Sequence, residues 1–172
     1  MITLKNLCND LEDLLESTKF SDYCPNGLQV EGSQEINCIA TGVSASLETI
    51  QKAIEKKADV LLVHHGIFWK NDDFCITANK RKKIALLLKN NISLIAYHLP
   101  LDAHRTLGNN WKAAMDHSWG NLEPFGESNG QYIGVKGSFP EISRQDFQKK
   151  LENYYQHPAH TALFGKEKIS TA

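Results

Sequence analysis

Apolar residues recur at helical spacing near the start of the chain. Five leucines between residues 3 and 17 are three or four positions apart or adjacent: Leu4, Leu7, Leu11, Leu14 and Leu15. This pattern predicts an amphipathic helix that buries the leucines, with Thr3 as its N-cap. A stretch of turn-forming residues follows, and the alternation over 28–30 then predicts a short strand.

The next part of the chain alternates between β-branched apolar runs and helical patterns. These patterns predict strands at 36–43, 59–63 and 92–97, with helices at 47–57 and 79–89 between them. Ser46 is placed to cap the first of these helices, and Ile84, Leu87 and Leu88 are expected on one face of the second. This order predicts an α/β fold with a mostly parallel or mixed sheet covered by helices.

The pattern becomes less regular after a further predicted helix at 110–117. Proline, glycine and serine become frequent from Asn121, which predicts a boundary between an α/β lobe at 1–120 and a second region at 121–172. Within that second region we expect strands at 131–136 and 161–164, with a helix at 143–154 between them.

Composition and charge exclude several classes of protein. The chain has 172 residues, 41% of them hydrophobic, and a net charge of -1, so it is long enough for a core and is not typical of disorder. No basic run exceeds the four residues at 80–83, so nucleic-acid binding is not expected. With no signal peptide pattern or apolar membrane span, we expect a cytoplasmic protein with no membrane partner. The four scattered cysteines are expected to be ordinary reduced thiols.

Three histidines and an aspartate follow two of the predicted strands. His64 and His65 come directly after the strand at 59–63, His98 directly after the strand at 92–97, and Asp102 four residues later. The carboxyl ends of parallel strands face the crevice where ligands bind. Because Pro100 disfavours a regular helix here, we expect a shaped loop to hold His98 and Asp102. Imidazole and carboxylate together favour Zn, Fe, Mn, Co or Ni over Mg or Ca.

The adjacent histidines leave the arrangement of such a site open. Neighbouring side chains on an extended strand point to opposite sides, so His64 and His65 would need a local bend to bind one ion. Two ions, or one ion with an outer histidine, are both compatible with the spacing. A histidine pair at a strand end can also cap the sheet or bond to loop carbonyls without any metal.

Three sequence blocks carry a family resemblance. They are SDYCPNGLQVEG at 21–32, VHHGIFWK at 63–70, and HLPLDAH at 98–104 followed by LGNN at 107–110. In this order and at these distances they resemble the NIF-three-like dinuclear-metal family, whose bacterial members are named GTP cyclohydrolase I type 2 homologs. The resemblance implies a NIF-three-like fold and a metal-binding lobe at 1–120, followed by the start of the family's central region.

The resemblance also implies the roles of individual residues. His64 and His65 would each bind one of two divalent metal ions, and Asp102 would join His65 on its ion. His98 would lie beside the ions as a ligand, as an outer-shell partner or as a proton-transfer group. The identity of the two ions is not implied.

The chain departs from the family pattern at its C-terminal end. The family has a further histidine and a bridging glutamate in a C-terminal His-x-x-x-Glu segment, and these ligands are absent from this chain, which ends at Ala172. His157, His160 and Glu167 are poor replacements because no glutamate lies four residues after either histidine. We therefore expect a fold truncated at the C-terminus.

Further residues are candidates for lining a pocket. Asp22 and Asn26 can reach the site from their loop, although a turn explains their sequence equally well and is the interpretation we favour. Phe68 and Trp69 could stack on a planar substrate, although packing is the more common role for such residues. His104 is near enough in sequence to the site to be a candidate.

Two functions follow from these residues. The first is a metal-dependent hydrolase, for which the resemblance implies GTP or a related nucleotide and a ring-shaped homo-oligomer built from dimers. No phosphate-binding G-x-x-x-x-G-K-[ST] loop is present to support that substrate. The alternative is a non-catalytic metal-binding interaction or regulatory protein, or an inactive truncated fragment.

Overall fold

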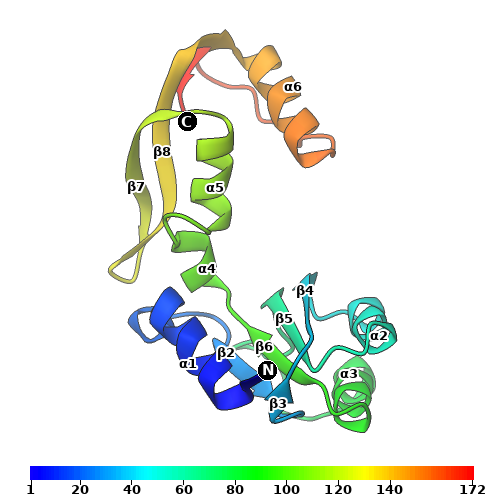
Figure 1. Cartoon of the computed structure of the whole chain (residues 1–172). Helices are drawn as coiled ribbons and strands as arrows, with labels where there is room; N and C mark the ends of the chain where they lie inside the picture. The colour runs from blue at the N-terminus through cyan, green and yellow to red at the C-terminus, as the bar shows by residue number, and fades with distance from the viewer.

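A computed structural model describes all 172 residues of the chain. An α/β lobe contains the N-terminal half, and a second part, built on a separate sheet, extends from its upper side (Figure 1). The mixed α/β architecture predicted from the sequence is confirmed. None of the helices is both long and apolar enough to cross a membrane.

The first helix, α1 (Leu4–Leu15), begins where the leucine pattern predicted. The Thr3 side chain accepts a hydrogen bond from the Asn6 backbone N–H, as expected of an N-cap. The prediction that all five leucines are buried is wrong for Leu14, which is 45% exposed. Leu14 lies on the flank of the apolar stripe and lines an open pocket, whereas Leu4 and Leu15 pack in the core.

Two sheets form the α/β lobe. In the larger one, β2 (Gly27–Val30), β4 (Ile39–Ser44), β5 (Val60–His65) and β6 (Ser93–Ala96) are ordered β2-β6-β5-β4. Strands β4, β5 and β6 are parallel and β2 runs antiparallel to β6, so the sheet is mixed. A small antiparallel pair joins β1 (Ile2–Thr3) to β3 (Glu35–Ile36).

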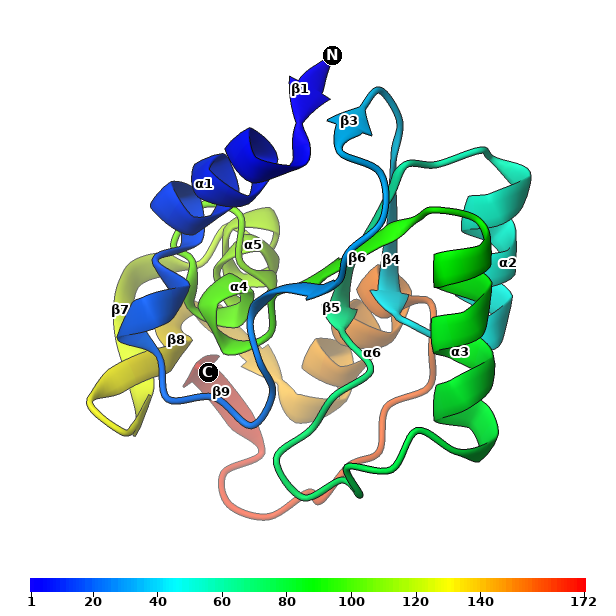
Figure 2. The same ribbon diagram turned by 90° about the horizontal axis from the view of Figure 1, so that it is seen from below.

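Helices cover both faces of the larger sheet, with α1 on one side and α2 (Leu47–Glu55) and α3 (Ala78–Lys89) on the other (Figure 2). Leu61 and Leu94 belong to the core beneath α2 and α3. The Ser46 side chain caps α2 as predicted. The prediction that Leu88 shares the buried face of α3 is wrong, because it lies about 100° around the helix from the fully buried Leu87 and is 57% exposed.

The segment after β6 is helical, not the predicted loop. It forms α4 (Leu99–Ala103), followed by α5 (Asn109–Asp116), which begins after Gly108. Pro100 occupies the first turn of α4, where a backbone N–H would have no partner within the helix. The proline is therefore compatible with this short helix.

The C-terminal part is built on an antiparallel sheet ordered β7-β8-β9. Its elements are β7 (Gly120–Ser128), β8 (Gln131–Ser143), α6 (Arg144–Tyr155) and β9 (Lys168–Thr171). Stacked rings of Phe139 and Phe147 hold α6 against β8. The predicted strand at 161–164 is absent because these exposed residues have no ladder partner; residues 168–171 pair with β8 instead.

Candidate metal centre

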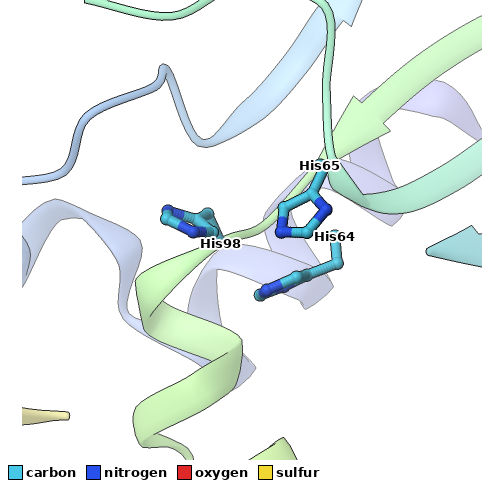
Figure 3. Close-up of side chains that lie close together, drawn as sticks. All are labelled: His64, His65 and His98. Carbon is cyan, nitrogen blue, oxygen red and sulfur yellow. The ribbon is translucent and has the colours of Figure 1, made fainter. Parts of the chain in front are cut away.

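Three histidines meet at the carboxyl end of the parallel strands. His64 and His65 are the last residues of β5, and His98 is the N-cap residue of α4, just after β6. One ring nitrogen from each lies within 4.8 Å of the others. Figure 3 shows the rings gathered beside the start of α4. The topology thus brings together side chains 34 residues apart in the sequence.

The expectation that His64 and His65 point to opposite sides is wrong, because their ring centroids are only 4.5 Å apart. The β5–β6 ladder ends at the pair Val63↔Ala96, so both histidines lie beyond its last rung. The chain leaves the strand at Gly66, and each ring is turned by a hydrogen bond of its own. His65 still pairs with Ser44 of β4, so side-chain alternation along the strand does not by itself keep the two rings apart.

A hydrogen bond holds each imidazole through its Nδ1 atom. Nδ1 of His64 lies 3.0 Å from the Tyr97 carbonyl oxygen, and Nδ1 of His65 lies 3.0 Å from the Ser44 hydroxyl oxygen. Nδ1 of His98 lies 2.8 Å from Oδ1 of Asp22. In all three rings, Nε2 is the nitrogen left to bind an ion.

Asp102 adds a carboxylate from α4. Its Oδ1 atom lies 3.5 Å from Nε2 of His64 and accepts a hydrogen bond of 2.9 Å from the Asn109 side chain. This distance places the carboxylate against His64. The prediction that Asp102 shares an ion with His65 remains a prediction.

Asp22 and Asn26 contact His98, so they do more than form the turn that their sequence favours. The Asp22 carboxylate, with a side chain only 2% exposed, accepts the His98 ring bond, and Oδ1 of Asn26 accepts the His98 backbone N–H at 2.8 Å. Burial alone would raise the pKa of Asp22, but hydrogen bonds led by that from His98 outweigh it and lower this pKa.

The other candidate pocket residues separate into two groups. The Trp69 ring lies beside the cluster, 5.8 Å from the His65 ring and 5.3 Å from the His98 ring between centroids. Phe68 packs partly against the core and lines a cavity of about 410 Å³ together with Trp69. His104 is not part of the cluster; it ends α4, where its Nδ1 accepts backbone hydrogen bonds from Thr106 and Leu107.

Burial and neighbouring charges favour the neutral form of His65. Burial, followed by the neighbouring His64 and His98, lowers the pKa of His65, and the nearby carboxylate of Asp102 opposes this shift. Neutral imidazole is the form that binds metal ions. Burial and then the Asp22 charge raise the pKa of the Cys24 thiol to about 12, so this nearby thiol stays protonated at neutral pH.

Sequence reasoning missed three residues at this site. Ser44 and the Tyr97 carbonyl hold histidine rings, and Cys24 offers a sulfur near Asp22 and His98. Ser44 pairs directly with His65 across β4 and β5, so correct strand register would have revealed it. The role of Tyr97 could not be predicted, because its backbone carbonyl accepts the hydrogen bond and every residue type has such a carbonyl.

Comparisons with known proteins agree on one family. A family model described as Duf34/NIF3 (NGG1p interacting factor 3) matches residues 2–172. A relative from Chlamydia trachomatis, named GTP cyclohydrolase 1 type 2 homolog, is 51% identical over 99% of this chain and 68% of its own length.

Solved structures give the same picture. The chain resembles protein ybgI, described as of unknown function, with a TM-score of 0.88 and 32% identity over 99% of this chain and 68% of the other. It also resembles a protein from Thermus thermophilus, with a TM-score of 0.89 and 28% identity over the same shares.

Proposed function

The chain belongs to the Duf34/NIF3 family, and from this premise we propose that it binds divalent metal and acts as a metal-dependent hydrolase on a nucleotide-type substrate. The observation that carries the proposal is the convergence of three imidazoles whose Nδ1 atoms are each held by a hydrogen bond. Such outer-shell hydrogen bonds are typical of histidines that bind metals.

The donor set fits a borderline transition metal. His64, His65 and His98 would supply nitrogen and Asp102 would supply oxygen, a mixture that suits Zn, Fe, Mn, Co or Ni. Two ions, as the family resemblance implies, need more ligands than these four residues provide, because even a tetrahedral site uses four. The second ion of the proposed pair therefore depends on water or on donors outside this group.

The proposed chemistry divides between the ion and the protein. A bound divalent ion polarises a substrate and lowers the pKa of water. The carboxylate of Asp102 is positioned to orient a water molecule near His64 and to accept its proton. His98 offers Nε2, as a ligand or as a proton acceptor, while Asp22 holds the opposite side of its ring.

The proposed substrate class rests on two supports. The curated relatives carry the name GTP cyclohydrolase 1 type 2 homolog. Beside the histidines, Phe68 and Trp69 line a cavity of about 410 Å³, which offers aromatic faces for a planar ring. Lys80 also lines this cavity, where its Nζ lies 3.6 Å from the Asp72 carboxylate. We propose GTP or a related nucleotide as the substrate.

We propose that the chain also forms a homo-oligomer, a ring of dimers by family resemblance. Strand β4 lies at an edge of the larger sheet, and its Val43 is 70% exposed and its Ile39 is 43% exposed. An apolar edge of this kind favours association. Light scattering on the purified chain measures the mass directly, and a monomer across the working concentration range would exclude the oligomer.

Metal content and turnover test the proposed function together. The chain is purified and loaded with Zn²⁺ or Mn²⁺, bound metal is counted by mass spectrometry, and hydrolysis of GTP is followed by chromatography. We expect stoichiometric metal in the parent and loss of metal in His65→Ala and Asp102→Ala. His104→Ala is the matched control, because this imidazole lies outside the cluster and should leave the metal content unchanged.

Each outcome has a distinct meaning. A parent chain without bound metal would refute the proposed function. Metal retained in both His65→Ala and Asp102→Ala would refute the assignment of ligands. Bound metal without turnover of GTP or related nucleotides would favour the alternative, a metal-binding interaction or regulatory protein.

A further inference from the structure

The carboxylate of Asp22 is buried behind His98 and has no lysine or arginine partner. Its Oδ1 accepts from the His98 ring and from the Tyr23 backbone N–H, and its Oδ2 accepts from the Asn26 side chain at 3.0 Å and the Leu99 backbone N–H at 2.9 Å. A buried carboxylate is costly unless such bonds compensate for lost hydration. Two of these bonds, from the His98 ring and the Leu99 N–H, join the loop to the start of α4, and the other two are internal to the loop.

This arrangement fixes which ring nitrogen of His98 carries a proton. An ionised carboxylate can only accept hydrogen bonds, so the His98 nitrogen facing Asp22 must be the donor, Nδ1–H. In the neutral ring, Nε2 then holds a lone pair. The Tyr97 carbonyl fixes His64 in the same way, whereas the Ser44 hydroxyl beside His65 can donate or accept.

The same loop also fixes the backbone on which His98 is mounted. Asn26 accepts the His98 backbone N–H at 2.8 Å and donates to Asp22, and Asp22 accepts the next backbone N–H, from Leu99. The linked side chains of Asp22 and Asn26 therefore hold both the ring and the backbone of His98. Rotation of the ring would break its bond to a buried charge.

We propose that Asp22 is a positioning residue for His98. It keeps the proton on Nδ1, so that the lone pair of Nε2 is free to bind an ion together with His64 and His65. Its consequence for metal binding rests on the proposed function, whereas the tautomer itself does not. Loss of outer-shell partners of metal-binding histidines typically weakens affinity about 10–100-fold. We expect a loss of that size for Zn²⁺ in Asp22→Ala.

The tautomer is measured on the full chain without metal. Long-range ¹H–¹⁵N correlation spectra distinguish Nδ1–H from Nε2–H rings, and at about pH 8.5 an ordinary imidazole is neutral. We expect the Nδ1–H form for His98 in the parent chain and a population of the Nε2–H form in Asp22→Ala. A His98→Gln spectrum assigns the resonances.

Asp59→Ala is a matched control for the spectra. The Asp59 carboxylate also accepts two backbone N–H groups, from Asn37 and Cys38, but it contacts no histidine. We expect this change to leave the His98 tautomer unaltered. A change as large as that in Asp22→Ala would mean that the tautomer follows general loss of stability, which would overturn the proposal.

The remaining outcomes separate this proposal from the proposed function. An Nε2–H ring in the parent, or an unchanged tautomer in Asp22→Ala, overturns the positioning role; if Asp22→Ala does not fold, the parent spectrum alone decides. Calorimetric titration with Zn²⁺ gives the second readout. If the parent does not bind Zn²⁺, the proposed function is refuted, but the tautomer result still stands. Equal Zn²⁺ affinity in the parent and in Asp22→Ala would overturn the role of Asp22 in metal binding.

Discussion

Gly108 is the position where the smallest change should disturb the candidate metal centre from a distance. A Cβ atom added there would lie within 3.0 Å of the backbone carbonyl oxygens of His104, Leu101 and Asp102. These oxygens belong to the end of α4 and to its C-cap residue, His104, and cannot rotate away as a side chain can. Gly108→Ala therefore forces the junction of α4 and α5 to open.

The expected cost follows from these contacts. Overpacking of a well-packed site costs about 1–3 kcal/mol, and Ala is also a poorer N-cap than Gly for α5. For a chain of this size each kcal/mol lowers the melting midpoint by about 2–4 °C, so we expect a decrease of roughly 2–12 °C. Because Asp102 belongs to the displaced turn, the affinity for Zn²⁺ should also fall.

Differential scanning fluorimetry and Zn²⁺ titration measure the two effects. Gly120→Ala is the matched control, because its added Cβ would meet only Ser138 atoms at 3.7 Å and 3.9 Å, which is ordinary contact. We expect the control to change stability by less than about 0.5 kcal/mol. A Gly108→Ala chain with the same melting midpoint as the parent would refute the close approach of α4 and α5.

Three further predictions follow from the fold and the site. Leu61→Ala, at a fully buried position beneath α2 and α3, should cost about 2–5 kcal/mol in urea denaturation, and a cost below about 1 kcal/mol would contradict this core. Asn26→Ala leaves the His98 backbone N–H without its acceptor and should cost about 1–3 kcal/mol by the same assay; no measurable change would contradict that bond. Because its pKa is raised to about 12, Cys24 should remain a protonated thiol at about pH 8 and should resist iodoacetamide. The exposed Cys75 should react, and peptide mass mapping would detect the difference. Equal labelling of both cysteines in the folded chain would contradict the burial of Cys24.

The sequence was sufficient to predict the elements that depend on local pattern. The spacing of Leu4, Leu11 and Leu15 predicted α1, the caps Thr3 and Ser46 marked two helix starts, and the alternation of strands and helices predicted the mixed sheet. Each of these signals is carried by residues near one another in the chain.

Features that depend on contacts between distant segments were missed or mistaken. The rings of His64 and His65 are held by the Tyr97 carbonyl and the Ser44 hydroxyl, on neighbouring segments of the sheet. The contact of Asp22 with His98 joins residues 76 positions apart. Pro100 disfavours a regular helix by sequence pattern, but the first turn of α4 tolerates it. Contacts between distant segments decided the histidine and aspartate positions, and the position of the proline within its helix decided the third case.

The position of a bound metal ion in a crystal of the chain tests the proposed metal centre most directly. After loading with Zn²⁺, anomalous diffraction at the zinc edge locates the ion independently of any assumed ligand. We expect a peak about 2.0–2.1 Å from imidazole nitrogens of the His64, His65 and His98 cluster, the distance usual for zinc and histidine. A zinc-loaded crystal with no peak at these three side chains would contradict the proposed metal centre.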